Sequence, residues 1–388
     1  MNIIVFEDHY VSDLYPFSTN HASFEMKIGS KSNIDRISSL LKPEDKLFVN
    51  VRNEISDLIK ERYPNVVVNS DIIPPGLLLN GASIWSELLY SNLKFDQIYS
   101  SDEKLVALYI EQSISRNDLP KLLSDSLQIT RNISIKHISY LWDAVDSISD
   151  CIDLDVENYL ECKNGNIHPS VVLINPENIF IADDSYIMAG GIVDASSGPI
   201  IIDNNATIDI GCLIKGPAYI GKNVTINPGA KLRGKISIGK FSKVGGELSN
   251  VIIHGYSNKQ HDGFLGNSFI GEWVNLGANT NNSNLKNNYS NVKVRLALHK
   301  SIDTNKQFIG SFIGDYSRLG ISTMLNTGTV ISLGANIFNE GYQSKFIELF
   351  SWGKDDKVDI DKFLNTLKIM KKRRCKDISE AEKLFLIN

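Results

Sequence analysis

The sequence predicts two domains, an α/β domain followed by an all-β parallel β-helix built from hexapeptide repeats. A chain of 388 residues is too long for one ordinary hydrophobic core, which indicates at least two domains. In the first part, strand-like and helix-like segments alternate. In the second part, aliphatic residues recur at every sixth position, and this period fits neither an α-helix nor an ordinary half-buried strand.

The period of six is unbroken from residue 202 to residue 244. An aliphatic residue occupies each such position: Ile202, Ile208, Ile214, Ile220, Ile226, Leu232, Ile238 and Val244. A second, mostly smaller residue follows four positions after each one, as at Ala206 and Cys212. A solenoid of short parallel strands explains both positions, because each turn points one aliphatic and one small side chain inward. The same spacing returns at Phe264–Leu276 and Ile313–Ile337.

Alternating segments in the first part predict an α/β layer with a largely parallel sheet. The expected strands are Asn2–Phe6, Lys46–Val51, Asn65–Val68 and Leu77–Leu79, and the expected helices are Ser32–Leu41, Asn53–Glu61 and Asp118–Leu127. We therefore divide the chain into an α/β domain at residues 1–135, a connecting segment at 136–175, a β-helix at 176–353 and a helical tail at 354–388.

Composition limits the classes of function. The net charge of −5 gives no support for general attraction to nucleic acids or membranes. The first residues are too short an apolar run for a signal peptide, and no run approaches the ~20 apolar residues of a membrane helix. The cysteines, Cys151, Cys162, Cys212 and Cys375, are far apart, which favours ordinary thiols of a reducing cytoplasm. The expectation is a cytoplasmic protein without nucleic-acid or membrane partners.

Two interruptions of the repeat, at 250–262 and 281–308, carry most of the polar candidates. Solenoid insertions tend to gather on one face, which is often where binding occurs. His254 and His261 belong to the densest polar cluster, and a loop histidine can take a proton from an amine or hydroxyl. The competing interpretation is a histidine bonded to backbone carbonyls. In the tail, Lys371–Arg374 is interpreted as a solvated helix face rather than a nucleic-acid contact.

The segment His261–Asn275 resembles the acetyltransferase segment of the bacterial GlmU family, which makes UDP-N-acetylglucosamine. The family motif is a histidine, two variable residues, tyrosine–leucine–glycine, and then asparagine–isoleucine/leucine–glycine–alanine. The matching residues here are His261, Phe264-Leu265-Gly266 and Asn275-Leu276-Gly277-Ala278, with no gap. This family joins a uridylyltransferase to a left-handed β-helix that acetylates glucosamine 1-phosphate.

The resemblance implies a role for each matching residue. His261 would be the general base, Asn275 would contact the amino sugar, and Arg233 would grip the sugar phosphate with its planar fork. Glu247 and Phe264 would line the same site, and Ala278 would contact acetyl-CoA. Asn288, Tyr289 and Lys293 resemble a family loop that closes over the sugar, with a short insertion allowed. Two alternatives stay open: Asn275 could stack in an asparagine ladder, and Arg233 could pair with a carboxylate.

Two family positions are changed. Ser249 replaces a lysine and Phe264 replaces the motif tyrosine, and both family residues touch the sugar 1-phosphate. Phosphate recognition must therefore come from other groups, for which Lys231 and Lys259 are candidates, or the substrate differs.

The first domain departs further from the family. A glycine-rich loop normally follows its first strand, because backbone N–H groups there wrap the triphosphate, but Gly29 is the first glycine of this chain. This half resembles a divergent GlmU-like group of sugar nucleotidyltransferases common in Bacteroidetes-type bacteria, through Pro16-Phe17, Lys27 and Gly29. Lys27 is the best basic candidate for contacting phosphates, and Mg²⁺ would assist if this domain is active.

The family resemblance implies a cytoplasmic homotrimeric transferase of sugar nucleotide biosynthesis. It would transfer an acyl group, most simply acetyl from acetyl-CoA, to an amino-sugar 1-phosphate such as glucosamine 1-phosphate. Nucleotidylyl transfer by the first domain could follow. Two alternatives stay open: a sugar-1-phosphate nucleotidylyltransferase whose β-helix only trimerises, and a non-catalytic sugar-nucleotide-binding protein.

Overall fold

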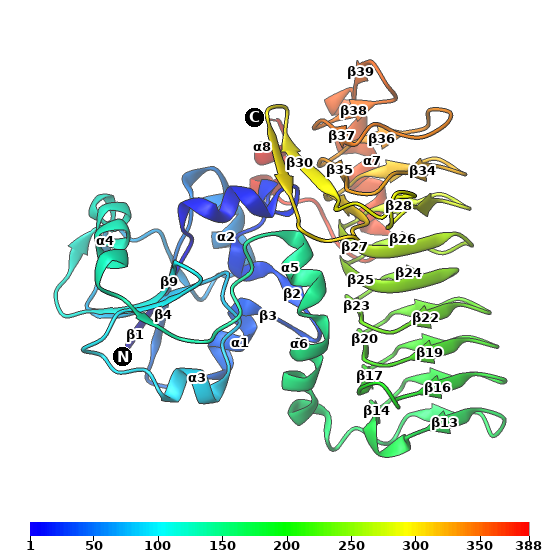
Figure 1. Ribbon diagram of the computed structural model, residues 1–388, viewed down its shortest axis with the longest axis horizontal. Helices are drawn as coiled ribbons and strands as arrows, with labels where there is room; N and C mark the ends of the chain where they lie inside the picture. The colour runs from blue at the N-terminus through cyan, green and yellow to red at the C-terminus, as the bar shows by residue number, and fades with distance from the viewer. Residues whose placement is uncertain (388) are drawn as a thin grey trace.

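The computed structural model describes residues 1–387 and contains an α/β domain packed beside a long parallel β-helix (Figure 1). The α/β domain has one seven-stranded sheet with the order β11-β8-β9-β7-β1-β4-β5. Its strands are β1 (Asn2–Phe6), β4 (Lys46–Asn50), β5 (Val67–Val68), β7 (Gly76–Asn80), β8 (Tyr99–Ser101), β9 (Lys104–Ile110) and β11 (Arg131–Asn132). The pairs β1–β4, β1–β7 and β4–β5 are parallel, which confirms the expected layer, whereas β9 is an unexpected antiparallel strand.

Short helices and hairpins connect and cover this sheet. The expected helical segments are found: α1 (Asn33–Ser39) follows β3 (Lys31–Ser32), α2 (Ser56–Arg62) comes after β4, and α4 (Leu119–Ser126) begins directly after Asp118. The helices are η1 (His9–Leu14), η2 (Phe17–Thr19), η3 (Ser23–Glu25), α1 (Asn33–Ser39), η4 (Asn53–Ile55), α2 (Ser56–Arg62), α3 (Glu87–Ser91), η5 (Arg116–Asp118), α4 (Leu119–Ser126) and η6 (Leu127–Ile129). The small pairs are β2 (Lys27–Ile28) with β3 (Lys31–Ser32), and β6 (Ile72–Ile73) with β10 (Ile114–Ser115).

The repeats form coils with three faces, each a ladder of parallel strands. Partners on one face are 18 residues apart in the regular coils, as with Thr207 and Thr225, so three hexapeptides make one coil. The first face contains β12 (Asn166–Ile167), β15 (Tyr186–Ile187), β18 (Thr207–Ile208), β21 (Thr225–Ile226), β24 (Lys243–Val244), β26 (Asn258–Lys259), β28 (Asn275–Leu276), β33 (Arg318–Leu319), β36 (Asn336–Ile337) and β38 (Ser351–Trp352), and β39 (Asp356–Lys357) closes it antiparallel. The expected parallel β-helix is therefore present; its left hand stays a prediction.

Two further faces complete each coil, and the strands β25 (Glu247–Gly255) and β27 (Phe264–Glu272) run along both of them. The second face contains β13 (Val172–Ile174), β16 (Ile192–Asp194), β19 (Leu213–Lys215), β22 (Lys231–Arg233) and the first parts of β25 and β27. The third face contains β14 (Ile179–Ile181), β17 (Ile200–Ile202), β20 (Ala218–Ile220), β23 (Ile236–Ile238), the later parts of β25 and β27, β32 (Ser311–Ile313), β35 (Thr329–Ile331) and β37 (Phe346–Ile347). η8 (Pro176–Asn178) precedes β14.

The aliphatic positions of the repeat fill the inside of the coils. Ile202, Ile208, Ile214 and their equivalents are buried in one continuous core with the small residues Ala206, Cys212 and Ala218. All four cysteines are free thiols. The repeat thus acts as the sequence predicts, with two inward side chains per hexapeptide.

One expected interruption is not an insertion. Residues 250–262 stay in the coil stack, because β25 continues through the corner at Asn250 and β26 follows it. The period is lost there because this coil is shorter, with partners Lys243 and Asn258 only 15 residues apart. The second interruption does leave the stack. After β29 (Asn281–Asn282), which pairs with β34 (Met324–Leu325), the chain forms the hairpin β30 (Lys293–Ala297) and β31 (Lys300–Asp303).

The third face is covered by the rest of the chain. Its outward side chains are mostly apolar and are buried against α5 (Leu141–Asp146), α6 (Ile148–Asp155) and the β30–β31 hairpin: Phe180, Ile201, Tyr219, Ile252, Phe269, Phe312 and Val330. Figure 1 shows α5 and α6 between the two domains. The segment between the domains, with η7 (Val156–Tyr159), thus forms a large part of the interface.

The tail joins both domains. Helix α7 (Ile360–Lys372) packs on Tyr256, Trp273 and Tyr316 at one corner of the coils, and α8 (Glu380–Ile387) contacts α2. Lys371 is buried and donates a hydrogen bond to Glu382, so the basic run is not simply a solvated face. No helix within residues 1–387 is long and apolar enough to cross a lipid bilayer.

We expect Phe312→Ala to destabilise the protein by about 3–5 kcal/mol, because it removes a buried ring that contacts Trp142 of α5 at 5.8 Å between centroids. Urea unfolding followed by fluorescence measures the loss. Thr225→Ala, on the partly exposed outer side of the first face, should change the stability by less than about 0.5 kcal/mol. Equal effects of the two substitutions would contradict burial of the third face.

Candidate functional site

The second face presents a ladder of side chains from neighbouring coils. Lys231, Glu247 and Phe264 are register partners on β22, β25 and β27. Because side chains alternate along a strand, the partners next to them, Leu232, Leu248 and Leu265, point inward and are buried. The side chains of the first three therefore point outward, together with Arg233 at the end of β22.

Arg233 and Glu247 form an ion pair at 2.7 Å on this face. The Arg233 side chain is 60% exposed, so solvent screening leaves the pair little net stabilising energy. The alternative that Arg233 pairs with a carboxylate is therefore realised within the ladder itself. Its hydrogen bond to Glu247 uses only Nη1, and the rest of the guanidinium fork can still bind an anion.

His261 lies at the edge between the first and second faces, in the turn from β26 to β27, and its side chain is exposed. Lys259 holds this turn in place, because its buried ammonium donates hydrogen bonds to the carbonyl oxygens of Gly245, His261 and Asp262. Burial lowers the pKa of Lys259 to about 8. Three carbonyl acceptors match its three donors, so Lys259 positions the His261 turn and is a poor candidate for a substrate phosphate contact.

Ala278 lies at the same edge one coil further on. The two turns are joined by a hydrogen bond from the Asn279 N–H to the Asp262 carbonyl oxygen at 3.0 Å. Asn275 is exposed on the first face, where Asn258 Nδ2 donates to its Oδ1 at 3.4 Å. This contact is a short asparagine ladder, and it leaves the Asn275 amide nitrogen free to reach a ligand.

The excursion after β29 departs from the opposite edge of the second face. Asn284 Nδ2 donates to Asn267 Oδ1 at 2.8 Å, which holds the start of the excursion at the corner between the second and third faces. Asn288, Tyr289 and Lys293 are exposed on it. Within one chain, Asn288, Tyr289 and Lys293 therefore lie across the second face from the His261 and Ala278 turns.

Lys27 does not lie at the carboxyl ends of the parallel strands, where phosphates would bind in an open α/β sheet. It belongs to β2 and faces the β-helix, with its ammonium 5.4 Å from the centre of the Tyr219 ring. Burial, followed by the nearby charge of Lys240, lowers its pKa. The structure thus places Lys27 in the domain interface, which sequence reasoning could not anticipate because Tyr219 is far away in the chain.

A different cluster occupies the carboxyl ends of β1 and β7. Asn80, fully buried at the end of β7, donates from Nδ2 to Asp8 Oδ2 at 2.8 Å, and Asp8 follows β1. Nearby, His137 Nδ1 lies 3.0 Å from Ser83 Oγ. Asn80 could have been found from the sequence, since it follows the apolar run Gly76–Leu79 as the first polar side chain after a buried strand.

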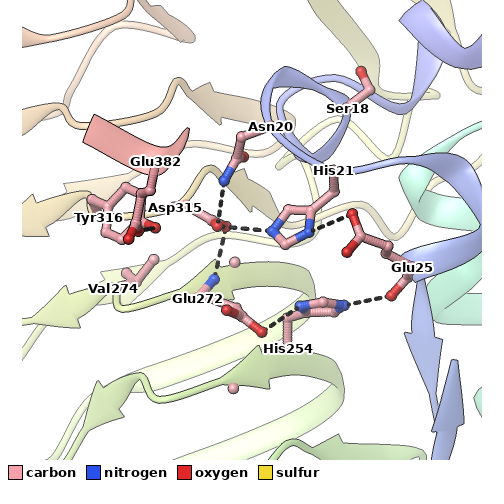
Figure 2. A network of polar contacts seen from close by, with 12 residues as sticks. Ser18, Asn20, His21, Glu25, His254, Glu272, Val274, Asp315, Tyr316 and Glu382 are labelled. Atoms are coloured by element: carbon pink, nitrogen blue, oxygen red, sulfur yellow. Dashed lines mark hydrogen bonds and ion pairs between the residues drawn. The ribbon is translucent and has the colours of Figure 1, made fainter. Parts of the chain in front are cut away.

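A buried polar network links the domains (Figure 2). His21 Nε2 and Asn20 Nδ2 each lie 2.9 Å from Asp315 Oδ2, and the Glu272 N–H donates to Asp315 Oδ1 at 2.8 Å. On the other side of the ring, His21 Nδ1 lies 3.3 Å from Glu25. Burial alone would lower the pKa of His21, but the Asp315 carboxylate raises it to about 9. These groups come from segments about 300 residues apart, so no sequence pattern indicated them.

Glu25 and His254 extend this network. Arg62 donates to Glu25 Oε2 at 2.8 Å; burial would raise the pKa of Glu25, but Arg62 and His21 hold it at about 2. His254 Nε2 lies 3.0 Å from the Glu25 carbonyl oxygen, and its Nδ1 lies 3.3 Å from Glu272 Oε1. Of the two histidines in the polar cluster, His254 is therefore bonded inside the fold and His261 is exposed.

Comparisons with known proteins agree with this two-part architecture. Residues 3–163 match the family described as sugar nucleotidyl transferase. The chain is 32% identical over 216 residues to the uncharacterized acetyltransferase YaiX of Escherichia coli strain 536, covering 55% of this chain and 85% of that protein. It is also 36% identical over 144 residues to the bifunctional sugar-1-phosphate nucleotidylyltransferase/acetyltransferase of Sulfurisphaera tokodaii, covering 36% of this chain and 35% of that protein.

Among solved structures, UDP-N-acetylglucosamine acyltransferase from Campylobacter jejuni is similar at 18% identity, covering 56% of this chain and 81% of that chain, with a TM-score of 0.23.

The fold and the relatives define a transferase in which a sugar nucleotidyl transferase domain is joined to a hexapeptide-repeat β-helix. The chain belongs to the family of the acetyltransferase YaiX, since it covers most of that protein at 32% identity. These matches support the predicted GlmU-like combination of a nucleotidyl transferase domain with an acetyltransferase domain, and the assignment to the Bacteroidetes group stays a prediction.

The partly buried ring of His137 predicts acid sensitivity of the first domain. Burial lowers its pKa to about 4, from about 6.5 in an unfolded chain. Below pH 6.5 the unfolded state takes up a proton that the folded state does not bind. Stability is therefore full above pH 6.5 and falls as the pH approaches 4, by up to about 3 kcal/mol. Urea unfolding of the wild type and His137→Gln between pH 7 and pH 4 tests this, because the variant should lose less; parallel curves would refute it.

Proposed function

We propose that the chain is an acyl-CoA-dependent N-acyltransferase that acts on an amino-sugar 1-phosphate, with acetyl transfer to glucosamine 1-phosphate as the leading case. The observation that carries the proposal is the exposed His261, held by Lys259 at the edge of a face that presents Arg233, Glu247 and Phe264. The acetyltransferase relatives support the same reaction class.

The reaction needs one base and two binding regions. His261 accepts a proton from the sugar amine as the amine nitrogen attacks the thioester carbonyl carbon; the carbon–sulfur bond then breaks, and the thiol of CoA leaves with a proton from the imidazolium. Arg233 binds the phosphate through its free N–H groups. The Phe264 ring offers an apolar wall in place of a tyrosine hydroxyl, and Ala278 lies at the same edge as His261, where the acyl-CoA would run.

The remaining residues support a shared site in a homotrimer. Because Asn288, Tyr289 and Lys293 lie at the opposite edge of the second face from His261, they would close over a sugar bound to a neighbouring subunit. The same face also carries an exposed apolar column in register, made of Val172, Ile192 and Leu213, with exposed fractions of 51%, 39% and 42%. An apolar stripe of this kind favours contact with another chain, and a closed ring of three suits a prism with a repeated face.

We further propose that the first domain transfers a nucleotidyl group to a sugar 1-phosphate. Ligands of open α/β sheets bind at the carboxyl ends of the strands, and Asp8 and Asn80 lie there on β1 and β7. Mg²⁺ is usually bound by one or two carboxylates together with substrate phosphates, and the single carboxylate of Asp8 fits that mode. Asp8 would hold the ion, which neutralises phosphate charge, and Asn80 would orient Asp8.

We expect His261→Ala to lower the rate of CoA release by 10²–10⁴-fold at saturating substrates, because a positioned base contributes about that factor. Free thiol is measured with acetyl-CoA and a panel of amino sugars and their 1-phosphates. His168→Ala is the matched control, since His168 is exposed and follows β12 at the same edge of the first coil. Unchanged release in His261→Ala would remove the base assignment, and no release from the wild type with any sugar would favour the scaffold alternative.

We expect Asp8→Asn to reduce pyrophosphate release at least 100-fold in the presence of Mg²⁺, an acetylated amino-sugar 1-phosphate and each nucleoside triphosphate in turn. The exposed Asp96→Asn should behave as the wild type. Release that is equal in both variants would exclude Asp8 from the reaction. If the wild type turns over no triphosphate, the nucleotidyl transfer proposal is wrong, and binding without turnover would favour the non-catalytic alternative.

A further inference from the structure

The interdomain network brings together ligand atoms suited to a metal ion. Among residues 1–387, one group of three such side chains has its donor atoms all within 4.8 Å of one another: His21, Glu272 and Asp315. His21 comes from the α/β domain, whereas Glu272 ends β27 and Asp315 follows β32. Figure 2 shows these side chains converging, with His254 beside them.

The cluster has an excess of negative charge, most of it buried. Glu25, Glu272 and Asp315 are three carboxylates, and Arg62 is the permanent cation paired with them. The side chains of Glu25 and Asp315 are only 6% and 2% exposed. Two uncompensated negative charges in such a place are costly, so two protons on the histidines or one divalent cation must balance them.

The histidine rings have the orientation that metal ligands usually have. A ligating histidine normally presents its other ring nitrogen to a carboxylate or a backbone carbonyl. His21 Nδ1 faces Glu25 at 3.3 Å, and His254 Nε2 faces the Glu25 carbonyl oxygen at 3.0 Å, although the Lys27 N–H lies 3.3 Å from the same nitrogen.

The opposite ring nitrogens both point into the cluster. His21 Nε2 points to Asp315, and His254 Nδ1 points to Glu272. His254 Nδ1 is buried, and its 3.3 Å contact with Glu272 Oε1 is an ion-pair distance without hydrogen-bond geometry; among residues 1–387 it accepts or donates no hydrogen bond, and the His254 side chain is 6% exposed.

We propose that His21, Glu272 and Asp315, with His254 as a fourth ligand, bind one divalent transition-metal ion of the Zn²⁺ type. Mixed imidazole and carboxylate ligands favour such ions over Mg²⁺ or Ca²⁺. The bound ion replaces the proton shared by His21 and Asp315, and the lone pair of His254 Nδ1 coordinates the ion. Glu272, whose side chain is 25% exposed, provides the route by which the ion enters.

The bound ion joins the two domains. One ligand belongs to the N-terminal segment, and the other three belong to the coils that also carry Asn275 and His261. Because metal ligation contributes directly to folding free energy, the ion stabilises the packing of the α/β domain on the third face. This role is independent of the acyltransferase proposal.

The full chain, freed of metal by chelation and dialysis, is titrated with Zn²⁺ and with Co²⁺. We expect one ion per chain by elemental analysis, visible Co²⁺ absorption bands typical of nitrogen and oxygen ligands, and a higher melting temperature with Zn²⁺. Asp315→Asn should lose the stoichiometric binding, and His254→Gln, a milder change, should weaken affinity by about 10–100-fold.

Glu382→Gln is the matched control, because it breaks a different buried ion pair, with Lys371, and should keep one ion per chain. Wild-type protein that binds no ion, or whose melting temperature responds to pH and not to Zn²⁺, would show that protons alone balance the charge and would overturn the proposal. Binding retained in both Asp315→Asn and His254→Gln would place the ion elsewhere and overturn it as well.

Discussion

The outward side chains of the third face determine how this protein is assembled. The inward side chains of a β-helix form a complete core, so the outer sides of its faces can in principle stay in contact with water. On the third face, however, the outward side chains of Phe180, Ile201, Phe269 and Phe312 are buried. Apolar surface of that extent must be removed from water. Helices α5 and α6 cover it, and the α/β domain is thereby held against the coils rather than joined to them by a free linker.

Covering one face leaves the other two for chemistry and association. The first and second faces carry exposed polar side chains, the second face also carries the apolar column of Val172, Ile192 and Leu213, and the edge between the two faces carries the His261 and Ala278 turns. The tail reinforces the same arrangement, because α7 packs on the corner residues Tyr256 and Trp273 while α8 returns to α2. Rigid coils therefore hold the exposed turns in fixed positions, which is the property that a positioned base requires.

The sequence predicted what depends on local repetition. The inward positions from Ile202 to Val244, the parallel sheet of the first domain and the helix after Asp118 are confirmed. The sequence could not predict burial that depends on distant segments. Lys27 and Lys259 look like free cations in the sequence, yet Lys27 lies over the Tyr219 ring and Lys259 donates hydrogen bonds to backbone carbonyl oxygens. A shortened coil also removed the period at 250–262 without producing an insertion. The roles of His261 and its neighbours stay predictions.

The buried network and the exposed turn together suggest why the two domains stay in contact. Glu272 is bound through the Asp315 carboxylate and lies three residues before Asn275, so the position of the coil that presents Asn275 depends on His21 from the other domain. Polar contacts buried in a low-dielectric interface are costly when one partner is missing. Separation of the domains would remove Asn20 and His21 from the Asp315 carboxylate and would loosen the same coil. In this architecture the α/β domain therefore supports the face that we propose for acyl transfer, whether or not it also performs a reaction of its own.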